Sequence, residues 1–261
     1  MTTATSGQPF VGTFNFSDGT FNNGCGHTLV GLGYAKGTWK QTGGTYKNLY
    51  SGANYGRGMI GGFGGEGCLE MSGGTFDFKS DMYVGGAETN VLVKGHSYAA
   101  QGLPVTRHDA QGTFRFSDGT AVFRSSLVLG ADGRGTLERV GTAGSFSVEG
   151  DLILSNTVEN AASGATLKFV YDDADGVKPI EVAGKLVICD GAKIEVDLGD
   201  YGTGETYRSK RYLVKPTGGV EGDFASVAVS LAGAREKDAV VKCDASGVYA
   251  SIPCGAIIMV R

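Results

Sequence analysis

The sequence has only 5 prolines and 3 histidines in 261 residues, and no apolar run approaches the roughly 18 residues that a membrane-spanning helix needs. We therefore expect no membrane span in this chain. The net charge of -4 is modest and gives no sign of the strongly basic face that a nucleic-acid partner requires, so we expect no nucleic-acid partner. The first ten residues lack the basic and apolar regions of a signal peptide. Because repeat-like sequence begins directly after them, we interpret the chain as an excised piece of a longer secreted protein.

Cysteine and histidine are too scattered to indicate a metal site. The 5 cysteines form no C-x-x-C pair, and His27, His96 and His108 never occur at metal-ligand spacing. Two interpretations of the cysteines remain open: buried small hydrophobic residues, which we favour, or a disulfide between Cys243 and Cys254. We predict no metal and no cofactor.

Two short motifs partly match known ligand-binding patterns. Gly62–Gly67 matches G-x-G-x-x-G, but a dinucleotide fingerprint needs a helix after it, and the next residues are strand-like. Asp172, Asp173 and Asp175 offer the carboxylate oxygens that calcium prefers, but Tyr171 breaks the EF-hand spacing. We interpret the first motif as part of a repeat and the second as a solvated turn.

Glycine, in contrast, is abundant, and its positions repeat. The 45 glycines far exceed the usual share of about 7%. Segment 31–46 aligns with segment 61–76 at an offset of 30 residues, with matches at Gly31/Gly61, Gly37/Gly67, Gly43/Gly73, Gly44/Gly74 and Thr45/Thr75. Self-similarity at such a period indicates a solenoid or another repeat array.

A five-residue motif recurs along the first 170 residues, with an apolar third position, a polar fourth and, except at Asn48, an apolar fifth. This alternation predicts strands with one buried face, and no period of 3.6 is visible, so we expect few helices. The motif occurs at 12–16, 44–48, 74–78, 112–116, 144–148 and, more loosely, 165–169. The stretches 12–20 and 112–120 differ only at the fourth position, Asn15 against Arg115.

Two all-β architectures are compatible with these strands: antiparallel hairpins in a propeller or sandwich, or a single-stranded parallel β-helix with about 30 residues per turn. Hairpins need regular two-residue loops such as Asp-Gly. Most repeats lack one, so we favour the β-helix.

Stacking of equivalent residues then predicts columns along the axis. We expect Trp39 to lie over Leu69 in the core, and a ladder of aromatic residues beside them. We interpret the outward column as control of register, because opposite charges on neighbouring strands attract. The predicted aromatic ladder is Phe14, Tyr46, Phe76, Phe114 and Phe146, and the predicted outward column is Asn15, Lys47, Asp77, Arg115, Ser147 and Lys168.

The character of the sequence changes at about Val170, which divides the chain into β-helix repeats at 1–170 and a continuous C-terminal β-strand extension and cap at 171–261. A solenoid needs atypical terminal repeats, because an open stack exposes unpaired backbone. We expect a hairpin turn at Asp244–Gly247 and strands at 179–188, 192–198, 211–214, 225–231, 239–242 and 247–252.

The repeat pattern resembles the passenger repeats of autotransporter-type bacterial surface proteins. The resemblance rests on segments 37–46 and 67–76, followed by 167–169, 179–182, 191–198 and 247–253. It implies a right-handed parallel β-helix outside a bacterium, secreted or on the cell surface, commonly as an adhesin-like stalk. The chain departs from that family because no membrane β-barrel sequence follows the repeats.

These patterns favour a non-enzymatic structural or adhesive module over the alternative, a glycan-active enzyme such as a polysaccharide lyase or glycoside hydrolase. Glycoside hydrolysis needs two carboxylates facing one groove, and the predicted outward column has only Asp77. We assign no catalytic residue. The best candidate ligand site is Tyr50, Asn54, Tyr55 and Arg57, which would stack on and hydrogen-bond to an extracellular glycan or another host or cell-surface ligand; the alternative is an ordinary strand and turn.

Overall fold

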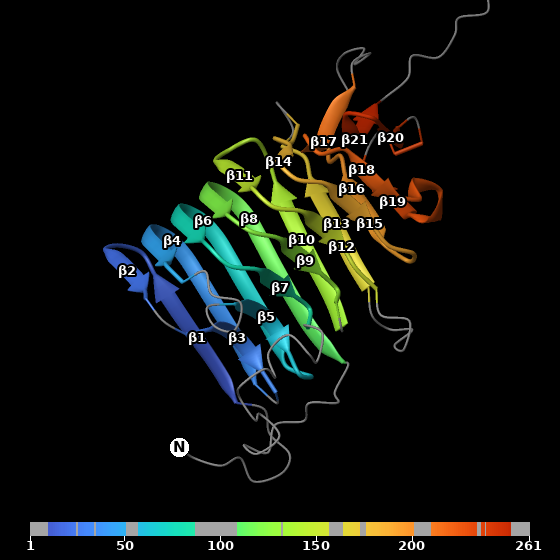
Figure 1. The fold of residues 1–261 in the computed structure, drawn as a ribbon. Coiled ribbons are helices and arrows are strands. Elements are labelled where there is room, and N and C mark those ends of the chain that lie inside the picture. Colours follow the sequence, from blue (N-terminus) through green and yellow to red (C-terminus); the bar gives the residue numbers. More distant parts are fainter. Residues whose placement is uncertain are drawn as a thin grey trace, which may run out of the picture.

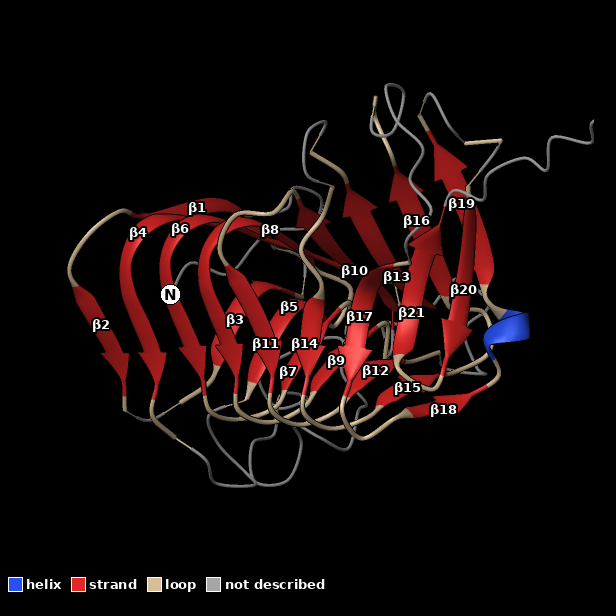
Figure 2. Cartoon of the chain, turned by 90° about the horizontal axis from the view of Figure 1, so that it is seen from above, coloured by secondary structure: helices blue, strands red, loops and turns tan. Residues whose placement is uncertain are grey.

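The structure is a computed structural model, and most of the residues that it describes lie in β-strands (Figure 1). Its described residues contain one short 3-10 helix, η2 (Phe224–Ser226), and no α-helix (Figure 2). The all-β class predicted from the sequence is therefore confirmed. The described residues are 10–24, 26–33, 35–50, 57–86, 109–131, 133–156, 164–172, 176–200, 210–233, 236–237 and 239–251.

One sheet, sheet B, has seven short strands that all run parallel in the order β18-β15-β12-β9-β7-β5-β3. Each strand follows its neighbour by one repeat of the sequence. Their bounds are β3 (Thr28–Leu32), β5 (Gly58–Gly62), β7 (Met82–Val84), β9 (Leu127–Leu129), β12 (Leu152–Leu154), β15 (Leu186–Ile188) and β18 (Val220–Gly222).

The other sheet, sheet A, has 14 strands and is mixed. Its pairs are parallel except at the C-terminal end, where β21 runs antiparallel to β17 and β20. Its strands are β1 (Val11–Phe16), β2 (Thr20–Asn23), β4 (Lys36–Asn48), β6 (Glu66–Phe78), β8 (Ala110–Phe123), β10 (Gly133–Val140), β11 (Ser145–Val148), β13 (Gly164–Val170), β14 (Ile180–Val182), β16 (Lys193–Asp197), β17 (Arg211–Pro216), β19 (Ala228–Ala232), β20 (Val240–Asp244) and β21 (Gly247–Ser251).

Equivalent residues of successive repeats pair with one another. The offset between partners is 30 residues from β4 to β6, as at Gly37 and Gly67, but 45 from β6 to β8 and 23 from β8 to β10. The variation arises in the connections between strands, which differ in length. We call this set of parallel, repeat-on-repeat strands the stack.

Each of the first five repeats has, in two places, a glycine followed two residues later by an apolar side chain, and this changes the predicted ladder. Phe14 and Phe114 pair in register with Trp39 and Leu69, whereas Tyr46, Phe76 and Phe146 belong to a second column. The ladder predicted from the sequence therefore merged two columns, although Trp39 does lie over Leu69 in the core. The first inner column is Phe14, Trp39, Leu69, Phe114, Leu137, Leu167, Ile194 and Val229, and the second is Phe21, Tyr46, Phe76, Ala121 and Phe146.

The predicted outward column is divided in the same way. One outer column alternates in charge after its first member: Asn15, Lys40, Glu70, Arg115, Glu138, Lys168 and Glu195. Lys47, Asp77 and Ser147 lie in the other outer column. In the alternating column Nζ of Lys40 lies 3.4 Å from a carboxylate oxygen of Glu70, and Glu138 pairs with both Arg115 and Lys168. Opposite charges in register favour this pairing over a slipped one.

Glycine allows the two sheets to approach closely at one corner. Gly61, in sheet B, has φ +69, and a Cβ on it would lie 2.0 Å from the carbonyl oxygen of Gln111. A Cβ on Gly67, in sheet A, would lie 2.2 Å from the nitrogen of Gly61. Side chains at either position would clash with backbone, which is why the glycines recur.

Parallel pairing continues past residue 170 through β13, β16 and β19. The boundary that we place at 170/171 stays a prediction. The predicted turn at Asp244–Gly247 is confirmed, since these residues close the β20–β21 hairpin. Two expected strands are wrong in detail: 179–188 is split into β14 and β15 by a turn at 183–185, and the strand expected from Ala225 begins only at Ala228, after η2.

The core runs through the whole stack and, among the described residues, contains one buried cation, Arg139. Its side chain is 0% exposed and lies over the ring of Phe116, with 4.9 Å between the guanidinium carbon and the ring centroid. The guanidinium donates hydrogen bonds to the carbonyls of Val140 (2.8 Å) and Ala143 (2.7 Å). Burial lowers the pKa of Arg139 to about 10. These bonds satisfy carbonyls where the chain leaves β10 and turns toward β11.

Candidate functional site

A tight corner joins each sheet A segment to the following sheet B strand. In five repeats this corner has three residues: 79–81, 124–126, 149–151, 183–185 and 217–219. The corners stack on one another through backbone hydrogen bonds, such as Gly150 N–H to Ser125 O and Gly184 N–H to Gly150 O. Glycine at Gly150 fits because a Cβ there would lie 2.6 Å from the carbonyl carbon of Ser125.

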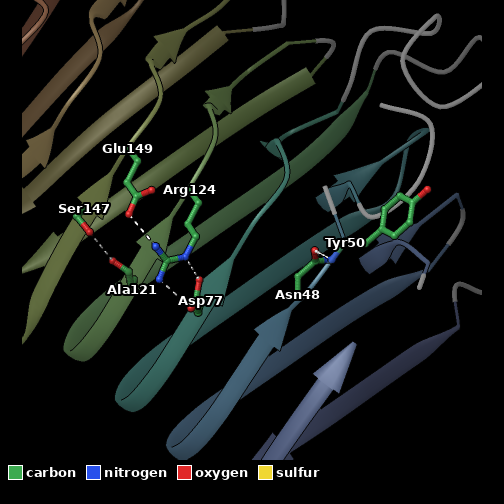
Figure 3. Close-up of polar contacts among 7 residues, drawn as sticks. All are labelled: Asn48, Tyr50, Asp77, Ala121, Arg124, Ser147 and Glu149. Carbon is green, nitrogen blue, oxygen red and sulfur yellow. Dashed lines mark hydrogen bonds and ion pairs between the residues drawn. The ribbon is translucent and has the colours of Figure 1, made fainter. Parts of the chain in front are cut away.

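The second repeat departs from this pattern, and the departure coincides with the predicted ligand site. Its corner runs from Leu49 to Arg57, nine residues between β4 and β5. Tyr50 is half-buried at the start of this corner, and its backbone N–H donates to Oδ1 of Asn48 at 3.2 Å (Figure 3). Arg57 closes the corner, and its carbonyl accepts the N–H of Thr28. The structure thus places Tyr50 and Arg57 in one insertion; Asn54 and Tyr55 lie outside the described residues.

A cluster of charged side chains occupies the same edge of the stack two repeats further on. We call Asp77, Arg124 and Glu149 the Arg124 cluster. Nε and one Nη of Arg124 donate to the two carboxylate oxygens of Asp77 at 2.7 and 3.1 Å, and the other Nη donates to Glu149 at 3.0 Å (Figure 3). The hydrogen bonds to Asp77, followed by the charge of Asp77 and then that of Glu149, raise the pKa of Arg124.

The residues that flank Asp77 in the structure differ from those that the sequence predicts. The sequence places Asp77 between Lys47 and Arg115, but the structure pairs it with Lys47 and Val122 in its column. Arg115 lies in the alternating column, with its Nε 3.1 Å from Glu138. Within the described residues, Asp77 and Glu149 thus come from the repeats on either side of Arg124 and bind its one guanidinium. Such bidentate binding fixes the carboxylates and joins three repeats.

The structure also brings together groups that the sequence analysis did not single out. Asp81 accepts hydrogen bonds from the hydroxyl of Ser125 and from the N–H of Ser126 (3.2 Å), and Asp151 accepts from the N–H of Lys185 at 2.7 Å. Acids at these corners therefore bind backbone of the next repeat. The sequence does contain a pattern that could have located these corners. Three mostly polar residues repeatedly separate an alternating strand from a short apolar run such as Leu127–Leu129.

The remaining candidates show no assembled site in the part of the chain that the structure describes. Cys68, Cys189 and Cys243 carry free thiols, and Cys254 lies outside the described residues. The described residues contain no group of three or more metal-ligating side chains. Asp172 forms a bridge with Gly176, while Asp173 and Asp175 lie outside the described residues, as do His96 and His108. Segment 62–67 connects two strands, β5 and β6, so no helix follows this glycine motif.

Comparison with known proteins adds no relative. No family model, no curated protein and no solved structure matches the chain. No helix in the described ranges is long and apolar enough to cross a membrane.

Proposed function

We propose that this chain is a structural or adhesive module: a right-handed, single-stranded parallel β-helix that is secreted or held at a cell surface, as in the autotransporter-type passengers that its repeats resemble. The module acts by projecting a rigid surface, with no catalysis. The observation that carries the proposal is that charged side chains on the outer faces bind neighbouring repeats. Lys36–Glu66, the alternating column and the Arg124 cluster all cross from one repeat to another.

Adhesion is assigned to the corner insertion 49–57. The other segments that join sheet A to sheet B have three residues, or four in the first repeat at 24–27, so segment 49–57 is five or six residues longer than its equivalents. Its second residue is an aromatic, Tyr50, and its last is a cation, Arg57. Aromatic rings that stack on sugars and guanidinium groups that donate hydrogen bonds suit an extracellular glycan as ligand.

A glycan array with purified protein tests the assignment. We expect binding without turnover, which falls at least about tenfold in the double variant Tyr50→Ala/Arg57→Ala, the loss of one or two good contacts. A matched control is Lys79→Ala, in the three-residue corner of the next repeat, which should bind as the unchanged protein does. Equal binding by the double variant would place the ligand elsewhere.

The same samples test the enzymatic alternative. Release of reducing ends or unsaturated sugars from a bound polysaccharide would overturn the non-enzymatic proposal. The variants Asp77→Asn and Glu149→Gln should then abolish that activity if the Arg124 cluster were its source. Under our proposal they lower only the free energy of unfolding.

A further inference from the structure

Three inner columns of the stack become polar beside the corner insertion 49–57. Thr28, Tyr46 and Asn48 are 7%, 1% and 2% exposed, so they belong to the core and not to the solvated surface. Buried polar groups need hydrogen-bond partners, because an unsatisfied one is costly. In later repeats these columns are apolar: Met82, Leu127 and Leu152 follow Thr28 and Gly58, Phe76, Ala121 and Phe146 follow Tyr46, and Phe78, Phe123 and Val148 follow Asn48.

The hydroxyl of Tyr46 connects these side chains in one hydrogen-bonded network. It shares a hydrogen bond with the hydroxyl of Thr28 and accepts another from the side-chain amide of Asn23 at 3.3 Å. Burial raises the pKa of Tyr46, and hydrogen bonds with Thr28, Asn23 and Asn48 oppose that rise. The hydroxyl therefore links Thr28 to Asn48, which a phenylalanine at this position could not do.

The network reaches both ends of the insertion. At its start, Oδ1 of Asn48 accepts the backbone N–H of Tyr50 at 3.2 Å (Figure 3). At its end, the backbone N–H of Thr28 donates to the carbonyl of Arg57 at 3.0 Å. The two residues that we assign to ligand binding are therefore joined to each other by a path of hydrogen bonds that passes through the core at Tyr46.

The three-residue corners are closed without side-chain hydrogen bonds of this kind. At corners 124–126 and 149–151 the last residue accepts the equivalent backbone bond, from the N–H of Met82 and of Leu127. Both donors have apolar, buried side chains. A segment of nine residues loses more conformations when its ends are held than a segment of three. Additional hydrogen bonds at its two ends therefore help to fix them.

We propose that Tyr46 is a positioning residue of the ligand site: together with Thr28 and Asn48, its hydroxyl fixes both ends of the insertion and so holds Tyr50 and Arg57 in place for the ligand. The role in ligand binding rests on the proposed function, whereas the fixing of the two ends rests on the hydrogen bonds alone. A site whose ends are already fixed loses less conformational entropy when a ligand binds. Polar groups in these core columns thereby serve the surface above them.

Tyr46→Phe tests the proposal, because it removes only the hydroxyl and leaves a ring of the kind that the column already contains at Phe76. Hydrogen exchange measured by NMR reports on the two ends directly, through the backbone amides of Thr28 and Tyr50. We expect both amides to exchange at least about threefold faster in the variant, since the network loses a hydrogen bond. The amide of Met82, which makes the equivalent bond at corner 124–126, should be unchanged.

Binding to the glycan array should weaken about three- to tenfold in Tyr46→Phe. Thr28→Val removes the other hydroxyl, keeps the shape of the side chain and should act in the same direction. The double variant should lose less than the product of the two single effects, because both substitutions break one network. The matched control is Tyr212→Phe, which removes a hydroxyl that donates to Asp244 at 3.2 Å and should leave binding unchanged.

The two readouts separate this proposal from the proposed function. If the unchanged protein binds a glycan and Tyr46→Phe binds it equally well, the positioning role is wrong while the adhesive function stands. If no glycan binds, the adhesive function fails, and hydrogen exchange at Thr28 and Tyr50 still decides whether Tyr46 fixes the insertion. A lower unfolding temperature with unchanged exchange at both amides would show a purely structural network and overturn the proposal. Circular dichroism establishes that the variants are folded, and Thr28→Val carries the test if Tyr46→Phe unfolds.

Discussion

Stretches 12–20 and 112–120 have the same sequence except at one position, yet they occupy opposite environments. Phe14 is 47% exposed at the edge of the stack, whereas Phe114 is 0% exposed between β6 and β10. The backbone differs as well. Residues 17–19 form a bend between β1 and β2, whereas 117–119 continue strand β8 as part of its ladder with β6. The same three residues therefore form a bend at the edge and a strand where a preceding repeat, β6, lies beside them.

The comparison separates what a local sequence does from what its neighbours do. Asp18 and Asp118 each accept a hydrogen bond from the next residue's N–H at 2.6 Å, so the local turn chemistry is unchanged. Burial, by contrast, comes entirely from the adjacent repeat. Matched substitutions in the two stretches therefore measure how much packing against a preceding repeat contributes to the free energy of unfolding.

The largest contrast should come from the first phenylalanine of each stretch. Phe114→Ala opens a cavity in the packed core and should lower the free energy of unfolding by about 3–5 kcal/mol. Phe14→Ala removes a half-exposed ring and should cost less than about 1.5 kcal/mol. Urea denaturation followed by circular dichroism measures both. Equal costs would contradict the burial seen in the structure.

Glycine gives the next contrast. A Cβ at Gly112 would lie 2.0 Å from Ile60 O and 2.3 Å from Gly85 N, whereas a Cβ at Gly12 meets nothing within 4 Å. We expect Gly112→Ala to destabilise by about 2–3 kcal/mol through forced backbone shifts. Gly12→Ala should stabilise by about 0.5 kcal/mol by restricting the unfolded chain. Thermal unfolding of the two variants measures both effects. If Gly112→Ala were as stable as the unchanged protein, the two sheets would be further apart at Gly112 than the structure shows.

The fourth position tests the alternating column. Arg115→Glu places a third carboxylate between Glu70 and Glu138 and should cost about 1 kcal/mol, whereas Asn15→Glu faces Lys40 and should be neutral or stabilising by a few tenths of a kcal/mol. High salt should shrink both effects. If Arg115→Glu were as harmless as Asn15→Glu, the ion pairs would not contribute to register.

The smallest effect concerns Cys68, which pairs with Thr113 where Thr13 pairs with Thr38. Burial, then the charge of Glu70, raises the pKa of the Cys68 thiol to about 11. The folded state therefore holds the proton more tightly than the unfolded state, and this contribution to stability is present below pH 9 and is lost as the pH rises toward 11.

Iodoacetamide labelling mapped by mass spectrometry checks this pKa. The labelling rate of Cys68 should keep rising with pH up to about 11, and Glu70→Gln should increase the rate at pH 9. Cys68→Thr should leave stability unchanged, because threonine fills this column in the neighbouring repeats. Half-maximal labelling near pH 8 to 9 would contradict the burial of the thiol.

Sequence alone was sufficient to find the strands and the repeat, because alternation of apolar residues is local. It was insufficient to choose the register. The Gly-Thr-aromatic triplets at Gly37 and Gly44 are seven residues apart in the same strand. From the sequence alone, the triplet at Gly44 can therefore be aligned with the one at Gly112 as readily as with the triplets that share its column in the structure. The merged aromatic ladder follows from this ambiguity.

The candidate site was located only in part. Tyr50 and Arg57 were named from their chemistry, but the sequence did not show that they belong to a nine-residue corner where the repeats on either side have four and three residues. Arg124 was missed, because its partners Asp77 and Glu149 are 47 and 25 residues away in the sequence.

What the sequence determined by itself is therefore the all-β class, the repeat and the glycine positions, since these depend on side-chain alternation and on backbone geometry within a few residues. The tertiary structure decided which repeat covers which. That choice sets the register of the columns, the partners of Asp77 and Arg115, and the exposure of Phe14 against the burial of Phe114, because pairing between distant strands is fixed only when whole repeats pack together.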